Sequence, residues 1–261
     1  MAVFKSISLG QGTSAQRDYD IWLYDEEFDL WGGIKGYLDG SIQCCETLKN
    51  THHSIVERFR HGDSWVYVKR PKGRDDRPWE RILELFRPGE ARRYADSMVR
   101  LEEMGFKGPK PISVVERRSL KVLVESYIFY WGVEGRHVTD LDSKLVGASL
   151  QQLHDLGWMR RDAIPRNFLV QEDAVVYIDF RLSSPLMFRK TRQGREKEQL
   201  IRHLPEAQSA MNLSHRESRL LRFFLWYKKA TRGVKKFRRR HGVWIYSAIL
   251  ILMLVFFLSV K

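Results

Sequence analysis

Alternating apolar and polar residues in the first half of the chain predict a sheet. Residues 54–59 and 65–70 each have the two-residue period of a half-buried strand. The His-Gly-Asp turn signal at residues 61–63 lies between them, so the two segments predict a hairpin. Residues 112–116 and 120–130 are rich in β-branched and aromatic side chains, which predicts two further strands. This half of the chain is therefore expected to be mainly β.

The helical period appears beside and after these strands. It predicts helices at residues 80–87, 89–104 and 141–156, and a mostly helical, strongly basic segment at residues 194–232. The clearest is 89–104, in which Ala91, Tyr94, Ala95, Met98 and Leu101 share one face and Gly105 is a good stop signal. Residues 168–170 and 175–178 predict a short hairpin within the second half. The periodicity of residues 1–40 is unclear.

The C-terminal segment has neither period, because it is apolar throughout. Residues 243–260 contain no charged side chain, and about 18 helical residues span roughly 27 Å, close to the hydrocarbon thickness of a bilayer. The run predicts a transmembrane anchor at residues 242–261. A basic juxtamembrane segment, residues 235–241, precedes it with Lys235, Lys236, Arg238, Arg239 and Arg240. By the positive-inside rule this cluster, and the body before it, are expected on the cytoplasmic side.

Composition and net charge limit the classes of molecule that the chain is expected to bind. The chain has 261 residues and a formal net charge of +13, which favours anionic partners such as acidic lipids, phosphorylated glycans or nucleotides. Nucleic acid is disfavoured because no zinc-finger spacing, basic zipper or RNP-type motif is present. The two cysteines, Cys44 and Cys45, are adjacent, which is unsuitable for a structural disulfide and indicates a reducing compartment.

Three polar residues in the second half have the spacing of a phosphotransferase site. Asp162 follows the predicted helix 141–156, Asn167 comes five positions later, and Asp179 ends the short hairpin. A carboxylate such as Asp162 can orient an acceptor hydroxyl and accept its proton. Asn167 and Asp179 offer the hard oxygen ligands that Mg²⁺ prefers. The pattern predicts Asp162 as the catalytic residue and Asn167 and Asp179 as ligands of Mg-ATP.

A lysine in the first half completes this pattern. Lys69 lies in the second strand of the predicted hairpin, where kinase-like folds hold the ATP phosphates with a lysine. The strand alternation places Val66 and Val68 on one face and Tyr67 and Lys69 on the other. The acid that pairs with Lys69 is left open by the helical pattern, with Glu84, Glu90 and Asp96 all available.

The block LHDLGWMRRDAIPRNFLV…YIDF resembles the lipopolysaccharide core heptose(II) kinase family, small bacterial kinases of inner-core sugars. The likeness extends through TLKNTHHSIVERFRHGDSWVYVKRPKGR, WERILELFRPGE and VEG at residues 133–135, and covers roughly residues 45–235. It implies the same roles for Lys69, Asp162, Asn167 and Asp179, with ATP and Mg²⁺ as cofactors. The chain departs from the usual pattern in three places: residues 49–53 lack glycine, Arg181 follows Asp-Phe, and Arg160 stands where relatives often carry histidine.

The predicted fold class is therefore α+β: a protein-kinase-like, two-lobed fold followed by one C-terminal transmembrane helix. The expected domains are an ATP-binding lobe at 1–131, with residues 1–45 as an uncertain extension, and a catalytic lobe at 132–234. The basic segment 235–241 and the anchor 242–261 follow.

The predicted function is ATP-dependent phosphorylation of a heptose of the lipopolysaccharide inner core at the cytoplasmic face of the bacterial inner membrane. The core glycolipid and the membrane are the expected partners, without nucleic acid. Two alternatives stay open. One is a kinase for another acceptor, such as Kdo, another sugar or a protein. The other is a membrane-tethered pseudokinase that binds a partner without catalysis.

Overall fold

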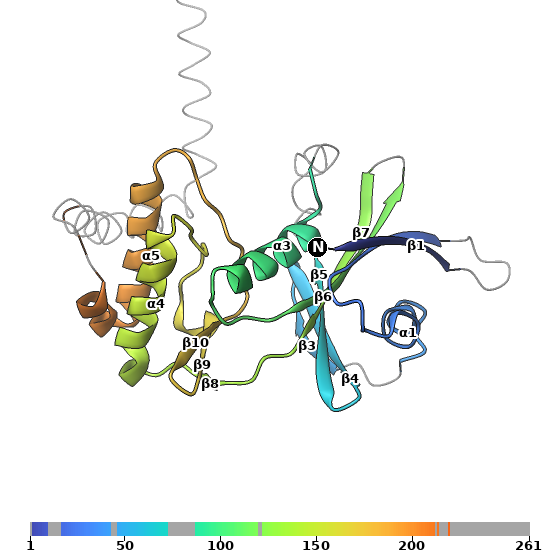
Figure 1. The fold of residues 1–261 in the computed structure, drawn as a ribbon, viewed down its shortest axis with the longest axis horizontal. Helices are drawn as coiled ribbons and strands as arrows, with labels where there is room; N and C mark the ends of the chain where they lie inside the picture. The colour runs from blue at the N-terminus through green and yellow to red at the C-terminus, as the bar shows by residue number, and fades with distance from the viewer. Residues whose placement is uncertain are drawn as a thin grey trace, which may run out of the picture.

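A computed structural model describes residues 2–9, 17–42, 46–72, 87–119 and 122–211, together with residues 213 and 219. Within these residues, seven antiparallel strands form the larger sheet, in the order β1-β2-β6-β7-β5-β4-β3. Its strands are β1 (Val3–Leu9), β2 (Arg17–Leu23), β3 (Glu46–Asn50), β4 (Ser54–His61), β5 (Ser64–Pro71), β6 (Pro111–Ser119) and β7 (Val122–Trp131). Figure 1 shows this sheet on one side of the molecule.

The hairpin of β4 and β5 has the alternation expected from its sequence. Val66 and Val68 are fully buried and pack with Phe59 and Phe129 on one face of the sheet. Lys69 belongs to the opposite face and lies opposite Ile128 of β7. The pleat of β5 therefore turns this lysine away from the apolar cluster and toward the rest of the molecule.

Helix α3 (Glu90–Glu103) crosses next to the sheet, between its strands and the helical part of the chain (Figure 1). Ala91, Ala95 and Leu101 are completely buried on the face that the helical period predicts. The helix ends at Glu103 with Met104 as its C-cap, and Gly105 follows in the left-handed conformation with φ of 81°, which glycine adopts without steric cost.

The second half of the chain folds around a small sheet. β8 (Arg136–His137), β9 (Phe168–Gln171) and β10 (Ala174–Tyr177) pair antiparallel in the order β10-β9-β8. Helices α4 (Ser143–Asp155) and α5 (Arg189–His203) lie side by side beside it (Figure 1). Short 3-10 helices η2 (Asp140–Asp142), η3 (Pro165–Asn167) and η4 (Pro205–Ala210) connect or cap these elements.

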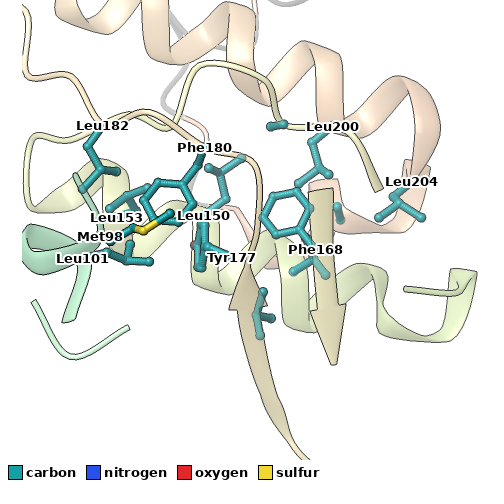
Figure 2. Packing of buried hydrophobic residues seen from close by; sticks show 14 of the residues in the cluster. Met98, Leu101, Leu150, Leu153, Phe168, Tyr177, Phe180, Leu182, Leu200 and Leu204 are labelled. Carbon is teal, nitrogen blue, oxygen red and sulfur yellow. The ribbon is translucent and has the colours of Figure 1, made fainter. Parts of the chain in front are cut away.

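One apolar core joins the two halves. Met98 and Leu101 of α3 belong to the same buried cluster as residues of α4, the β9–β10 hairpin and α5. Figure 2 shows Leu150 and Leu153 of α4 close to Met98 and Phe180. Because the hairpin that carries Asp179 is embedded in this core, its position relative to the large sheet is set by packing.

The described residues 2–9 and 17–40, whose period is unclear, form regular structure. Strands β1 and β2 extend the sheet, and β2 pairs with β6. A π-helix, η1 (Leu30–Lys35), and the short α1 (Gly36–Leu38) follow, with Ile34 completely buried. The N-terminal extension is thus part of the larger sheet. The helix expected at 80–87 and the chain after residue 219 lie outside the described residues.

The predicted fold class needs one correction. The α+β arrangement is observed, but none of the helices in the described part of the chain is long and apolar enough to cross a membrane. The physical reason is visible in α3, α4 and α5, which carry polar side chains on one face and end after 14, 13 and 15 residues. The predicted anchor 242–261 and basic segment 235–241 lie outside the described residues.

Candidate active site

A cavity of about 370 Å³ opens where the large sheet faces the β9–β10 hairpin, a volume within the range of ligand pockets. Apolar side chains from both halves make most of its wall, and a few charged groups converge on it. The lining residues are Leu48, Lys49, Val56, Tyr67, Lys69, Tyr94, Met98, Pro109, Ile128, Tyr130, Gly132, Val133, Gly135, His137, Leu169, Ile178, Asp179 and Phe180.

Lys69 and Asp179 meet in this cavity although 110 positions separate them in sequence. Lys69 Nζ donates a hydrogen bond to Asp179 Oδ1 at 2.5 Å, and it lies 4.0 Å from the ring centroid of Tyr94. Burial by itself lowers the pKa of the Lys69 ammonium, but Tyr94 and Asp179 outweigh burial and hold the pKa above its usual value. Lys69 is therefore a fixed positive charge in the cavity.

The pKa of the Asp179 carboxylate is shifted in the opposite direction. Burial raises the pKa of Asp179, but Lys69 and then Lys49 outweigh it and hold the pKa below its usual value. Lys49 Nζ lies 3.9 Å from Asp179 Oδ2, and it comes from β3, the first strand of the β3–β4 hairpin. The segment around the turn of this hairpin, residues 49–53, lacks the glycines of a phosphate-binding loop. It supplies a lysine instead of glycines. Sequence reasoning had no signal for Lys49.

The acid beside Lys69 is Asp179 and none of the three acids that the helical pattern left available. Asp96 accepts a hydrogen bond from Tyr24 Oη at 3.0 Å and does not reach Lys69. Glu90 forms no ion pair among the residues that the structure describes, and Glu84 lies outside them. The acid that contacts Lys69 is Asp179, and the α3 residue that contacts it is the aromatic Tyr94.

Asp162 and Asn167 lie within one tight loop. Asn167 Nδ2 donates to the Asp162 backbone oxygen at 3.0 Å and to Asp162 Oδ2 at 3.2 Å. Gln199 of α5 donates to the other carboxylate oxygen, Oδ1, at 2.5 Å. The carboxylate of Asp162 is exposed but oriented by two amides. Gln199 is one of the site residues that sequence reasoning missed.

Arg160 is the buried centre of this loop. Its Nη1 donates to the Asn167 backbone oxygen at 3.1 Å, and its Nη2 donates to the Ile178 backbone oxygen at 2.9 Å. The guanidinium also lies 4.1 Å from the Phe168 ring centroid, and burial lowers its pKa to about 10. Arg160 thus joins the loop that carries Asn167 to the strand end that carries Asp179. The sequence marks this position only as a departure from histidine.

Two site residues adopt unusual backbone conformations. Arg161 has φ of 82° and Asp179 has φ of 47°, the left-handed region that favours glycine. Such conformations cost about 1–3 kcal/mol and persist where surrounding contacts hold them. Arg160 is the chain neighbour of Arg161. Its guanidinium hydrogen-bonds the backbone oxygen of Ile178, which is the chain neighbour of Asp179.

The donor chemistry fits a nucleotide with Mg²⁺. Asn167 uses its amide nitrogen on Asp162, which leaves its side-chain oxygen without a hydrogen bond among the described residues. That oxygen and the Asp179 carboxylate are hard ligands, and Mg²⁺ usually takes only one or two protein groups with phosphate and water. Lys69 and Lys49 supply the positive charge that phosphate oxygens require.

The described chain has a β-rich half with a buried lysine and a helical half with a D-x4-N loop. An aspartate follows a hairpin in the helical half. Together these features define the protein-kinase-like fold. One solved structure supports this fold. A WaaP structure, in complex with acyl carrier protein, matches with a TM-score of 0.50 and 18% identity over 87% of this chain and 99% of that chain. The kinase domain of M. tuberculosis PknI matches with a TM-score of 0.40 and 14% identity over 66% and 73%. No family model matches the sequence, and no curated protein does.

Proposed function

We propose that this protein is an ATP-dependent kinase that transfers the γ-phosphoryl group to a sugar hydroxyl. The observation that carries the proposal is the convergence of Lys69 and Asp179 in a 370 Å³ cavity beside the loop of Asp162 and Asn167. Lys69 and Asp179 are 110 positions apart in the sequence, and the fold brings them together.

In this proposal each residue has one task. Lys69 and Lys49 hold phosphate oxygens, and Asn167 and Asp179 hold Mg²⁺, which neutralises negative charge on the phosphates when bound. Asp162 orients the acceptor hydroxyl and accepts its proton, while Gln199 and Asn167 keep its carboxylate in place. Arg160 positions the loop. Positioning and charge neutralisation supply most of the rate increase.

The proposed acceptor is a heptose of the lipopolysaccharide inner core. The support is the fold shared with WaaP, a lipopolysaccharide core heptose kinase, and the resemblance of the D-x4-N block to that group of kinases. The net charge of +13 suits an anionic glycolipid. We place the reaction at the cytoplasmic face of the inner membrane, because ATP is available there.

The test is transfer of labelled γ-phosphate from Mg-ATP to purified core glycolipid. The wild type should label it, and Asp162→Asn should lower kcat about 100-fold or more while binding of Mg-ATP persists, because only the proton acceptor is lost. Transfer to no core acceptor by the wild type would contradict the acceptor. Activity that survives Asp162→Asn would contradict the mechanism.

One observation favours a second candidate, a kinase-like protein that binds nucleotide without turnover. Both carboxylate oxygens of Asp162 already accept hydrogen bonds, from Gln199 and from Asn167. If Gln199 blocks the acceptor, then Gln199→Ala should create or raise phosphoryl transfer. If Gln199 orients a working base, the same substitution should lower kcat. The sign of the change separates the two candidates.

A further inference from the structure

Two arginines lie next to a short backbone bridge at the start of the Asp162 loop. Met159 and Ser183 exchange backbone hydrogen bonds of 3.0 and 2.9 Å in this antiparallel bridge. The Arg181 backbone nitrogen donates to the Arg160 oxygen at 3.4 Å, which places Arg181 beside the Arg160–Arg161 segment. Arg161 Nε also donates weakly to Ser183 Oγ, at 3.4 Å, across the same bridge.

A third arginine approaches from α5. Glu196 and Gln199 of this helix contact the catalytic loop, through the Arg160 backbone nitrogen and the Asp162 carboxylate. Arg192 precedes Glu196 by one helical turn and therefore shares its face. Neither this residue nor the two arginines at the bridge line the nucleotide cavity.

Among the described residues, none of these three arginines forms an ion pair with a carboxylate. Arg161 and Arg192 are exposed, and Arg181 is half-buried. Burial lowers the pKa of Arg161, and the charges of Arg181 and Arg192 lower it further, which outweighs the opposite effects of Tyr94 and Glu196. The backbone contact of Arg181 with Arg160 and the position of Arg192 on the loop-facing side of α5 agree with this effect on Arg161.

Several other arginines in the described part of the chain do have a carboxylate partner. Arg58, Arg117, Arg136 and Arg202 each pair with a carboxylate, at N···O distances of 2.6, 3.2, 2.6 and 2.7 Å. An ordinary solvated basic surface explains single exposed arginines. It does not explain three that meet beside the one carboxylate proposed to be catalytic, with Arg161 held in a left-handed conformation.

We propose that Arg161, Arg181 and Arg192 form a binding site for an anionic group of the acceptor, a phosphate or a carboxylate close to the hydroxyl that is phosphorylated. The inference rests on the proposed kinase function and narrows its acceptor to an already anionic sugar. Guanidinium groups bind both anions with paired hydrogen bonds, and three of them would hold the sugar relative to Asp162. Neutral sugars would lack this attachment.

The kinetic test compares acceptors and variants. The acceptors are core oligosaccharide as isolated, the same after removal of its phosphates, and the same after reduction of its carboxylates. Arg181→Gln and Arg192→Gln should each raise the acceptor KM about tenfold, more than they change kcat, because one charge-assisted contact is lost. Lys190→Gln, which removes a charge elsewhere on α5, is the matched control and should leave KM unchanged.

Removal of the recognised group should raise the wild-type KM by a similar factor, and the variants should then show little further loss. Which treatment has this effect identifies the anion as phosphate or carboxylate. A wild type that uses all three acceptors equally, or variants that keep the wild-type preference, would overturn the inference.

A binding test does not depend on turnover. With Mg-AMP-PNP present, calorimetry should detect inorganic phosphate binding to the wild type and to Lys190→Gln at millimolar concentration, and no binding to the triple Arg→Gln variant. If the wild type transfers phosphate to no acceptor but shows this binding, the acceptor assignment fails and the anion site stands. Equal binding by the triple variant, or none by the wild type, overturns the site.

The anion could also be a phosphorylated side chain of this chain. Mass spectrometry of the protein before and after incubation with Mg-ATP and after phosphatase treatment separates this source. Binding of inorganic phosphate that is seen only after phosphatase treatment would assign the site to the chain's own phosphate and overturn the acceptor version.

Discussion

Replacing Arg160 by methionine tests how the site is held together. The substitution keeps an unbranched side chain of similar length but removes the buried guanidinium, which has essentially no exposed surface. It deletes the donors to the Asn167 and Ile178 backbone oxygens, at 3.1 and 2.9 Å. The Asn167 backbone oxygen keeps one hydrogen bond, from the Ile178 backbone nitrogen. The Ile178 backbone oxygen loses the hydrogen bond from the Arg160 guanidinium.

The size of the effect follows from these contacts. Two charge-assisted hydrogen bonds contribute about 1.5–3 kcal/mol each, and the contact with the Phe168 ring adds about 1–2 kcal/mol. Against this, Arg160 Nε is buried without a partner, and removing it returns about 1–3 kcal/mol. The net loss in the free energy of unfolding is about 4 kcal/mol, with limits of about 1 and 7 kcal/mol. A domain with a stability of about 10 kcal/mol, in the middle of the usual range, would still fold.

Urea unfolding followed by far-UV circular dichroism measures this loss, and phosphoryl transfer on the folded fraction measures the effect on the site. We expect kcat to fall about tenfold or more, because the loop of Asn167 and the strand end before Asp179 are no longer joined. Arg100→Met is the control. It removes an exposed pair with Glu103 and a contact of 5.7 Å with the Trp158 ring, and should cost under about 1 kcal/mol. A loss below about 1 kcal/mol for Arg160→Met, or unchanged kcat, would refute the reasoning.

Three further predictions concern packing, acid stability and the lysine. Gly147→Ala should destabilise by about 1–3 kcal/mol in urea unfolding, because its Cβ would lie 2.5 Å from a backbone oxygen of η4. Gly194→Ala, with no atom within 4 Å, should instead stabilise by about 0.5–1 kcal/mol. Asp142 accepts two hydrogen bonds of 2.6 Å from one guanidinium, which holds its pKa below the usual value. This stabilisation is complete above about pH 4 and is lost as pH falls toward the folded pKa, so Asp142→Asn should flatten the fall of Tm with acid. Tyr94→Leu should raise the KM for ATP several-fold, whereas Tyr94→Phe should leave this KM unchanged. The reason is that the part of Tyr94 that contacts the Lys69 ammonium is its ring.

The sequence predicts elements whose signals are local. The hairpin of β4 and β5, helices α3 and α4, and the β9–β10 hairpin all lie where the two-residue and 3.6-residue periods place them. The side of β5 that faces the site is also correct, because alternation along a strand requires no knowledge of its partner.

The pairing of distant segments is not predictable in this way. Nothing in residues 1–40 shows that β2 pairs with β6, since the register joins positions near 20 to positions near 115. The predicted fold class is corrected in its transmembrane helix, which rests on the run at residues 242–261, outside the described part of the chain. The described helices include none that could span a bilayer.

For the candidate site, the sequence alone determined which residues are proposed for phosphotransferase chemistry, through the spacing of Asp162, Asn167 and Asp179 and the strand position of Lys69. Tertiary structure alone decided how they meet. It assigned Asp179 and Tyr94 as neighbours of Lys69, introduced Lys49 and Gln199, buried Arg160 at the centre, and gathered three arginines beside Asp162. The physical reason is that periodicity and spacing record interactions between near neighbours in the chain. The electrostatics of a site depend on distances across the fold, here between residues 110 positions apart.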